Sequence, residues 1–379
     1  MELRELQLAQ YRNIKEATLP LDARFTVIWG ENGAGKTNLI EAIYLVSTFR
    51  SFRTSDQRVL LKAGHTEALA RLKAFDSSLG LASTFEVRIA QNERSTRKSG
   101  SIDGKRIAAA KDFYGRVRAI LFTPEDLGML RGSPSGRRQF LDRVIFAQER
   151  THIGDIQDYE KTVRSRNKVL KSEGTMGRPQ QQALLDSYDE GVASLGARIW
   201  RRRASVVEAI RPGFLRAFEE IHGPGLEPAL EYASGVETKD PLPEQDEVQR
   251  SYLEQLQGKR GQDLARGATS VGPHRDDLRF TVFDSPAADF ASQGQARALV
   301  LAFKIAELRL TRTRIGYAPV LLLDDVSSEL DPSRNAKLFD MLWADAGQCV
   351  LTTTSPDFIR LAPGASHRSV QVVHGTLRA

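Results

Sequence analysis

One glycine-rich segment near the N-terminus constrains the fold of this chain more than any other feature. Residues 30–37 read Gly-Glu-Asn-Gly-Ala-Gly-Lys-Thr and satisfy the pattern G-x-x-x-x-G-K-[ST]. The apolar run Phe25–Trp29 precedes them and suits a buried strand, and apolar residues at helical spacing follow them. In that context, backbone N–H groups and the positive end of the helix bind nucleotide phosphates. A Gly-rich turn that binds nothing is the alternative, and the flanking strand and helix argue against it.

The motif assigns a role to each of its residues. Lys36 is a candidate catalytic residue that reaches the β- and γ-phosphates, and the Thr37 hydroxyl is a candidate Mg²⁺ ligand. ATP and Mg²⁺ are therefore the expected cofactors. The residues expected to surround the nucleotide phosphates are Gly30, Glu31, Asn32, Gly33, Ala34, Gly35, Lys36 and Thr37.

A second candidate element is a short apolar strand that ends in two carboxylates. Val320–Leu323 is followed directly by Asp324 and Asp325. In P-loop ATPases a carboxylate in this position holds the magnesium ion, which suits Asp324, and the next one can orient the attacking water, which suits Asp325. Two aspartates after a strand could instead cap a turn. The P-loop earlier in the chain favours the catalytic interpretation.

The segment Ala291-Ser-Gln-Gly-Gln295 resembles the LSGGQ signature of ABC-type ATPases, with Gln293 in place of the first glycine. The resemblance implies that Ser292, Gln293, Gly294 and Gln295 contact the γ-phosphate of ATP held by a second copy, so that two copies close around two nucleotides. Ser328–Asp331 is similar to the D-loop of that class. Residues 352–354 are three threonines where many ABC proteins have a histidine.

Several further segments, in order along the chain, resemble RecF, a family of bacterial recombination proteins. They are Tyr11–Asn13, Phe122–Leu127, Gly132–Asp142, Val271–Leu278 (Val-Gly-Pro-His-Arg-Asp-Asp-Leu) and Leu323–Asp331. The resemblance implies an ABC-type head like those of Rad50 and the SMC proteins, with a short helical arm in place of a long coiled coil.

The same resemblance implies a function. RecF proteins dimerise when ATP is bound, bind duplex or gapped DNA in that state, and are weak DNA-dependent ATPases. They act with RecR and RecO to help RecA load, in DNA repair, DNA replication and induction of the SOS response. Two local questions stay open. One is which of a phosphate-binding, a dimer-interface or a purely structural role His274 has. The other is which residue, Glu125 or Asp126, serves as the Q-loop residue.

Charge independently favours a polyanionic partner. The formal net charge is +6 and the sequence pI is about 9.4. Lysines and arginines concentrate in residues 94–143, 161–171 and 198–203, although a solvated basic face is the alternative. The candidate DNA-binding residues are Arg97, Lys98, Lys105, Arg106, Arg137 and Arg138.

Composition restricts the compartment. Cys349 is the one cysteine, which fits a reducing environment. No apolar run approaches the roughly 18 residues that span a bilayer, and the N-terminus has no signal-peptide pattern. A cytoplasmic protein is expected.

The order of these patterns predicts the organisation. The expected fold class is α/β: an ABC-type P-loop ATPase head of mixed sheets and helices, interrupted by an α-helical arm domain. The head takes residues 1–124 and 262–379, and the arm 125–261. Residues 66–122 are expected to form antiparallel β structure. Apolar residues spaced by three and four from about Gly136 to Lys171, and again from Leu185 to Ile199, predict a helical hairpin with arms about 50 Å long. Two ordinary packed core helices are the alternative.

Other classes fit less well. A nucleotide-binding subunit of another ABC-type assembly, such as a transporter, would be expected not to bind DNA. An SMC clamp needs much longer arms, and a P-loop kinase would lack the signature and D-loop segments. The acidic residues outside the nucleotide site form no metal cluster that would suggest a nuclease.

Overall fold

The computed structural model describes residues 1–77, 79–108, 113, 115–172, 177–236, 240–325, 332–356, 359 and 366–378. The chain divides into two compact units. The first comprises Met1–Leu127, Ala217–Gly223 and Val300–Ala379, and the second comprises Gly128–Arg216 and Pro224–Leu299. Among the described residues, no helix is both long enough and apolar enough to cross a membrane.

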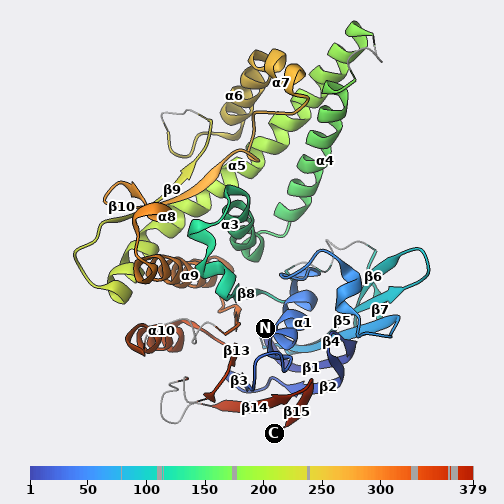
Figure 1. Ribbon diagram of the computed structural model, residues 1–379, viewed down its shortest axis with the longest axis vertical. Helices are drawn as coiled ribbons and strands as arrows, with labels where there is room; N and C mark the ends of the chain where they lie inside the picture. Colours follow the sequence, from blue (N-terminus) through green and yellow to red (C-terminus); the bar gives the residue numbers. More distant parts are fainter. Residues whose placement is uncertain are drawn as a thin grey trace. The chain divides into compact units, whose positions relative to one another are not determined.

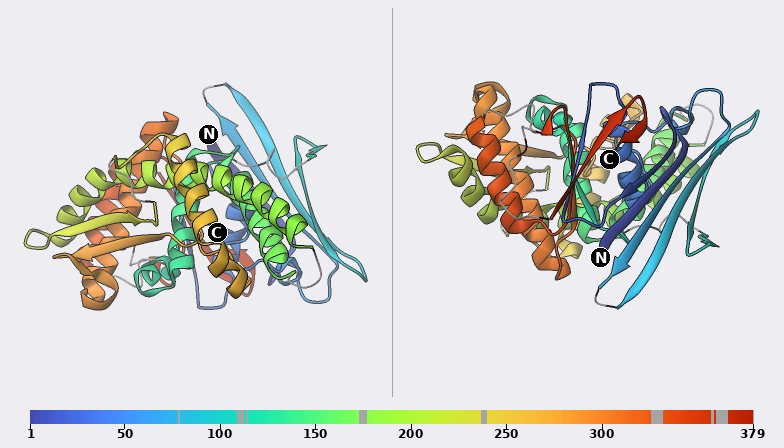
Figure 2. Two further views of the ribbon diagram at one scale, coloured as in Figure 1. Left: turned by 90° about the horizontal axis from the view of Figure 1, so that it is seen from above. Right: turned by 90° about the horizontal axis from the view of Figure 1, so that it is seen from below.

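The first unit contains an antiparallel sheet of long, twisted strands (Figure 2). The predicted antiparallel region is present, because buried residues alternate with exposed ones, as they do along β4. The strands, in spatial order, are β2 (Ile14–Pro20), β1 (Glu2–Tyr11), β4 (Glu67–Asp76), β5 (Leu81–Gln91), β6 (Thr96–Ile102) and β7 (Lys105–Arg106).

A second, mainly parallel sheet carries the predicted nucleotide-site strands. Its order is β15 (Thr376–Arg378), β14 (His367–Val373), β3 (Phe25–Trp29), β13 (Cys349–Thr353), β12 (Val320–Leu323) and β8 (Ala119–Phe122). β3 pairs in parallel with β13 and β14, and β12 with β13 and β8. The prediction that β8 belongs to the antiparallel region was wrong. All four of its residues are apolar and buried, as in a parallel strand covered on both faces, so they show no alternation.

Helix α1 (Lys36–Thr48) lies between the two sheets of this unit and packs against strands of both (Figure 1). Leu39, Ile40 and Ile43 are fully buried, so one hydrophobic core joins the helix to both sheets. The unit also contains α2 (Pro124–Leu127), α10 (Pro332–Asp345) and most of α9 (Gln293–Ile315).

The second unit is mainly helical. Its helices are α3 (Pro134–Gln148), α4 (His152–Leu170), most of α5 (Arg178–His222), α6 (Gln245–Gly258), α7 (Arg260–Arg266) and α8 (Ala287–Phe290). A small antiparallel sheet has the order β11 (Ser285–Pro286), β10 (Asp277–Val282), β9 (Pro228–Ala233). The core gathers apolar side chains of α4, α5 and α6, including Tyr159, Val192, Ile199 and Tyr252.

Helices α4 and α5 form the predicted pair, but with different lengths. The chain leaves the helix at Glu149 and re-enters it at His152, so the first predicted helix is divided into α3 and α4. The 19 residues of α4 correspond to about 28 Å rather than 50 Å. The second helix is longer than expected, with 45 residues that continue past Pro212 to His222.

The compact units differ from the predicted domain boundaries. Residues 125–127 and Ala217–Gly223, placed in the predicted arm, belong to the first unit. Residues 262–299, placed in the predicted head, pack with the helical unit. The reason is local: β10 pairs with β9, and α3 packs against β10. The assignment of residues 125–261 to an arm and of the flanking segments to a head stays a prediction.

Candidate nucleotide site

The predicted phosphate loop joins β3 to α1 at the end of a parallel strand. Gly30, Gly33 and Gly35 have φ values of 150°, 78° and 115°, which residues with a Cβ rarely adopt. A Cβ on Gly30 would lie 2.4 Å from the Val372 carbonyl oxygen. The loop residues Glu31, Asn32 and Gly33 are exposed, whereas Lys36 is buried at its base. The positive φ values and the close approach at Gly30 therefore favour glycine at these positions of the loop.

Lys36 is held inside the loop by the loop itself. Its ammonium donates hydrogen bonds to the carbonyl oxygens of Gly30 (2.7 Å) and Glu31 (3.0 Å). Burial lowers the pKa of Lys36, while Asp325 and Asp324 act in the opposite direction. The ammonium lies at the start of α1, where the backbone N–H groups of a helix N-terminus favour an anionic ligand.

Thr37 and Asp324 meet directly. The Thr37 hydroxyl donates to Asp324 Oδ1 at 2.9 Å, and the Thr352 hydroxyl donates to the same oxygen at 2.8 Å. The N–H of Asp325 donates to Thr352 Oγ1 at 2.9 Å. Thr352 is thus engaged with the two aspartates, and it joins the ends of β12 and β13 across the site.

The donor set fits a magnesium ion. Burial raises the pKa of the Asp324 carboxyl, the hydrogen bonds from Thr352 and Thr37 lower it, and the nearby charges of Glu125 and Asp325 raise it further. A hydroxyl and clustered carboxylates are hard oxygen ligands of the kind that Mg²⁺ prefers. A divalent cation would relieve the repulsion among these carboxylates. Glu125, to which the sequence assigned no definite role, belongs to this electrostatic environment.

Sequence reasoning missed the residues that support the loop from behind. Asn13 Nδ2 donates to the Ala34 carbonyl oxygen (3.0 Å), and Asn38 Nδ2 donates to Asn13 Oδ1 (2.8 Å). Arg12 forms a two-pronged contact with the fully buried Glu41 of α1, at 2.8 and 2.6 Å. The segment Tyr11–Asn13 stood out in the sequence, but only the fold shows that it contacts the loop and α1.

The predicted signature segment forms a capped helix start in the second unit. The Ser292 N–H donates to Gln295 Oε1 (2.8 Å), and the Gln295 N–H donates to Ser292 Oγ (3.2 Å). This reciprocal pair is a capping box at the N-terminus of α9. Ser292 and Gln293 are exposed, so the turn presents polar groups to the outside of its unit. The predicted D-loop, Ser328–Asp331, lies outside the described residues.

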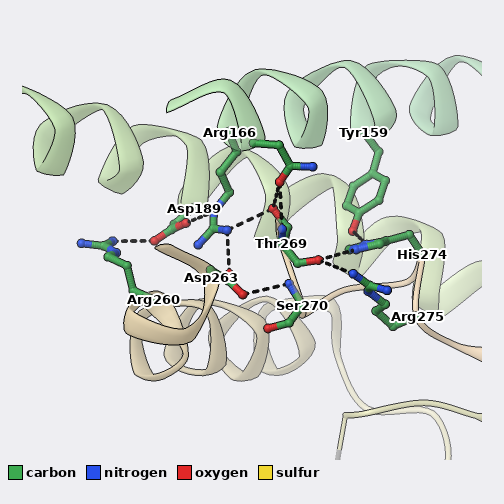
Figure 3. Close-up of polar contacts among 10 residues, drawn as sticks. Tyr159, Arg166, Asp189, Arg260, Asp263, Thr269, Ser270, His274 and Arg275 are labelled. Carbon is green, nitrogen blue, oxygen red and sulfur yellow. Dashed lines mark hydrogen bonds and ion pairs between the residues drawn. The ribbon is translucent and has the colours of Figure 1, made fainter. Parts of the chain in front are cut away.

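The Val271–Leu278 segment is bonded into the helical unit (Figure 3). His274 Nε2 lies 3.1 Å from the Thr269 carbonyl oxygen, and its Nδ1 lies 2.6 Å from the Tyr159 hydroxyl. The carbonyl can only accept, so Nε2 carries the proton and Nδ1 accepts from Tyr159. Burial lowers the pKa of His274 to about 4. These contacts give His274 a structural role.

Figure 3 also shows a buried ion cluster beside this segment. Arg166, predicted to lie in a basic face, is fully buried. It donates to Asp189 (2.6 Å), Asp263 (2.7 Å) and the Thr269 hydroxyl (3.0 Å). The cluster joins α4, α5 and α7 to the segment around Thr269, which precedes His274 in the chain.

The candidate DNA-binding residues fall into two groups. Lys98 donates to the Phe49 carbonyl oxygen (2.6 Å), and burial lowers its pKa to about 8. Arg137 forms a two-pronged ion pair with Asp277, and Arg138 donates to the Asp276 carbonyl oxygen. Within the described part of the chain, no carboxylate pairs with the exposed Arg97, Lys105 and Arg106, which lie on β6 and β7.

The third basic segment, residues 198–203, is also largely paired. Arg203 is buried and binds Asp142 through both prongs of its guanidinium, and Arg202 contacts Asp155 and Glu149. Much of the positive charge in residues 198–203 therefore serves the fold. The exposed cations that remain accessible to an anionic polymer include Arg97, Lys105 and Arg106 of the antiparallel sheet and Lys161, Lys168 and Lys171 of the second basic segment.

Comparison with known proteins shows the family of this chain. The family described as RecF/RecN/SMC N terminal domain matches residues 2–376. The DNA replication and repair protein RecF of Myxococcus xanthus is 35% identical over 95% of this chain and 92% of its own length. RecF of Anaeromyxobacter dehalogenans is 37% identical over 100% of this chain and 99% of its own length.

Solved structures extend the similarity to three dimensions. A structure of the recombination mediator protein RecF with ATP, in the RecFOR pathway, covers 100% of this chain and 97% of its own, with a TM-score of 0.88 and 29% identity. The Smc head domain of Pyrococcus furiosus shares the fold at a TM-score of 0.57 and 16% identity, covering 100% of this chain and 95% of its own. The expected ABC-type fold is confirmed. The chain belongs to the RecF family of DNA replication and repair proteins, within the wider group of RecF, RecN and SMC N-terminal domains.

Proposed function

We propose that this chain is an ATP-dependent DNA-binding protein of recombinational repair, in which ATP joins two copies on DNA and hydrolysis separates them. The observation that carries the proposal is the direct contact of Thr37 with Asp324 beside the buried Lys36, in a chain similar over its full length to a RecF protein solved with ATP.

Each residue of the site takes part in a definite way. Lys36 and the loop N–H groups bind the β- and γ-phosphates, and Thr37 and Asp324 hold Mg²⁺, which neutralises charge on the phosphates. Asp325 follows Asp324 at the end of β12 and orients the attacking water. The Thr352 hydroxyl, bonded to the Asp324 carboxylate and to the N–H of Asp325, keeps the Asp324 carboxylate and the Asp325 backbone in place.

A second copy completes the site. In the ABC class, the signature turn of one copy contacts the γ-phosphate bound by the other. The capped turn Ser292–Gln295 has exposed polar groups and helix N-terminal N–H groups suited to an anion. Ser292 and Gly294 therefore close the nucleotide of the opposite copy, and the resulting dimer has two equivalent sites.

DNA is held mainly through its phosphates. Arg97, Lys105 and Arg106 are exposed, and Arg106 and Lys105 pair across β6 and β7 with Ser101 and Ile102. Cations on a sheet surface contact backbone phosphates without reading sequence, so binding should weaken steeply with salt. In the cytoplasm, the bound dimer assists RecA loading at gaps together with RecO and RecR, in replication and in the SOS response.

Fluorescence anisotropy with a labelled gapped duplex tests the proposal. We expect tight binding with ATP, weak binding with ADP, and weak binding of Lys36→Met under both conditions. Affinity should fall by at least about tenfold between 50 and 200 mM salt. Equal affinity with ATP, with ADP and in the variant would contradict the nucleotide switch, and no binding at all would favour another ABC-type assembly.

Charge-reversal variants distinguish DNA contact at Arg97 and Arg106 from a general effect of the protein's net charge on DNA binding. Arg97→Glu combined with Arg106→Glu should weaken DNA binding and reduce its salt dependence. Lys15→Glu, which changes an exposed cation on β2, at the far edge of the same sheet, serves as the matched control and should have little effect.

A further inference from the structure

A continuous set of contacts inside the helical unit leads from the Val271–Leu278 segment to the signature turn. Arg137 is the first link. Its Nε and Nη2 donate to the two carboxylate oxygens of Asp277, at 2.8 and 2.7 Å, and its side chain is only 13% exposed. The planar guanidinium fork fixes this geometry more strictly than a lysine would.

The same guanidinium also holds a short turn that precedes α3. Arg137 Nη1 donates to the Leu130 carbonyl oxygen (3.2 Å) and to the Gly132 carbonyl oxygen (2.7 Å). These residues belong to, or directly follow, the 3-10 turn Met129–Arg131. One side chain therefore fastens the turn to the first residue of β10.

Arg131 completes the path. Its Nη2 donates to the carbonyl oxygen of Ala291 at 3.0 Å, immediately before Ser292. The 3-10 turn also packs against α8, the helix that ends at Phe290. The peptide that enters the signature turn is thus held from one side by Arg131 and from within by the Ser292–Gln295 capping box.

We infer that Arg131 and Arg137 are positioning residues for the signature turn: they orient Ser292–Gln295 for contact with the nucleotide of a second copy. The inference rests on the proposed function, because it assumes that this turn contacts the ATP bound by the other copy. It also gives Arg137, a candidate DNA contact by sequence, a different role.

The proposed role separates ATP capture from assembly. The phosphate loop belongs to the other compact unit, so a displaced signature turn should leave ATP binding by a single copy intact. Assembly of two copies should suffer, because the interaction of a helix N-terminus with a phosphate depends on the direction of its N–H groups.

Two variants and a control form the test. Arg131→Met removes the contact with Ala291, and Arg137→Met removes the contacts with Asp277 and the 3-10 turn. Arg201→Met is the control, because Arg201 forms an exposed ion pair with Glu244 in the same unit. Hydrogen exchange of the 292–296 amides, ATP affinity at dilute protein, and the ATP-dependent dimer dissociation constant are measured for each.

We expect faster exchange in this segment and at least about a tenfold weaker dimer for both variants, with ATP affinity within about twofold of the original chain. Arg137→Lys should behave like Arg137→Met, since it keeps the charge and loses the fork. Unchanged exchange and dimerisation in Arg131→Met, or equal changes in Arg201→Met, would overturn the inference.

The two proposals fail separately. If the unmodified chain does not dimerise with ATP, the proposed function fails, while the exchange measurement still shows whether Arg131 holds the turn. If the chain dimerises and Arg131→Met dimerises equally well with unchanged exchange, only the positioning role fails. Arg131 is exposed and contributes one contact, so its replacement should leave the fold intact.

Discussion

In the Val271–Leu278 segment, burial shifts the pKa values of two side chains, His274 and Asp276, in opposite directions. Burial lowers the pKa of His274 to about 4, below its ordinary value of 6.5, and the ring accepts from Tyr159 as a neutral group. Burial raises the pKa of Asp276 to about 6, although the Tyr232 hydroxyl donates to its carboxylate. Each side chain is therefore held closer to its uncharged form.

These pKa shifts predict that the contributions of His274 and Asp276 to folding stability change with pH in opposite directions. The unfolded chain protonates His274 more readily, so the stability that neutral His274 contributes is complete above pH 6.5 and is lost as pH falls towards 4. The stability difference between the original chain and His274→Gln should shrink over that range, by about 3 kcal/mol at most. For Asp276→Asn, the original chain should gain relative to the variant as pH falls through 6.

Urea unfolding at several pH values between 7 and 4 would measure both differences. A stability difference for His274→Gln that stays constant with pH would show that the ring is not kept neutral by its surroundings. The Asp276→Asn variant acts as the matched control, because any general acid effect on the fold would move both differences in the same direction.

For single residues, the sequence predicted a chemical role where the residue belongs to a recognisable motif. Lys36 and Thr37 lie in the predicted loop, and Thr37 contacts Asp324 from far along the chain. Arg137 and Lys98 show the limit: both are basic, but ion pairing and burial, which depend on distant residues such as Asp277 and Phe49, decide what they contact.

Among the elements, the turn between β1 and β2 stabilises the fold through an ion pair that the sequence does not show. Arg12 reaches the fully buried carboxylate of Glu41 in α1, and the Ser51 hydroxyl donates to the same carboxylate at 2.6 Å. A buried carboxylate that loses its cation is costly, because it keeps its charge without the compensating partner.

Arg12→Ala should therefore lower the free energy of unfolding by about 3–5 kcal/mol. Arg12→Ala combined with Glu41→Gln should recover part of that loss, since the second change removes the unpaired charge. Arg58→Ala is the control, because the Arg58–Asp56 pair is exposed and should contribute little. Equal destabilisation by Arg12→Ala and Arg58→Ala in chemical unfolding would contradict this account.

Helices and strands with a clear local sequence pattern could be predicted. Strands whose place depends on pairing with a distant strand could not. The apolar run at Val320–Leu323 and the loop–helix junction at Lys36 were predicted from sequence. The placement of β8 beside β12 depends on a partner about 200 residues away along the chain, and local alternation carries no information about it. The short β9 was missed because it forms by pairing with β10.

For the whole molecule, the central point is that the two halves of the proposed catalytic site belong to different compact units. The phosphate loop, Asp324 and Asp325 lie in the first unit, and the signature turn lies in the second. If the site is completed by another copy, as proposed, each dimer has two sites, and each site takes its phosphate loop from one copy and its signature turn from the other.

A complementation assay tests this sharing most directly. Lys36→Met disables the phosphate loop, and Ser292→Arg blocks the exposed signature turn, so each variant alone should lack ATP hydrolysis. In a mixed dimer, both defects fall in one site and the other site is intact. An equimolar mixture should therefore recover hydrolysis, to at most about a quarter of the original activity. Activity no greater than the sum of the separate variants would show that the site is not shared between copies.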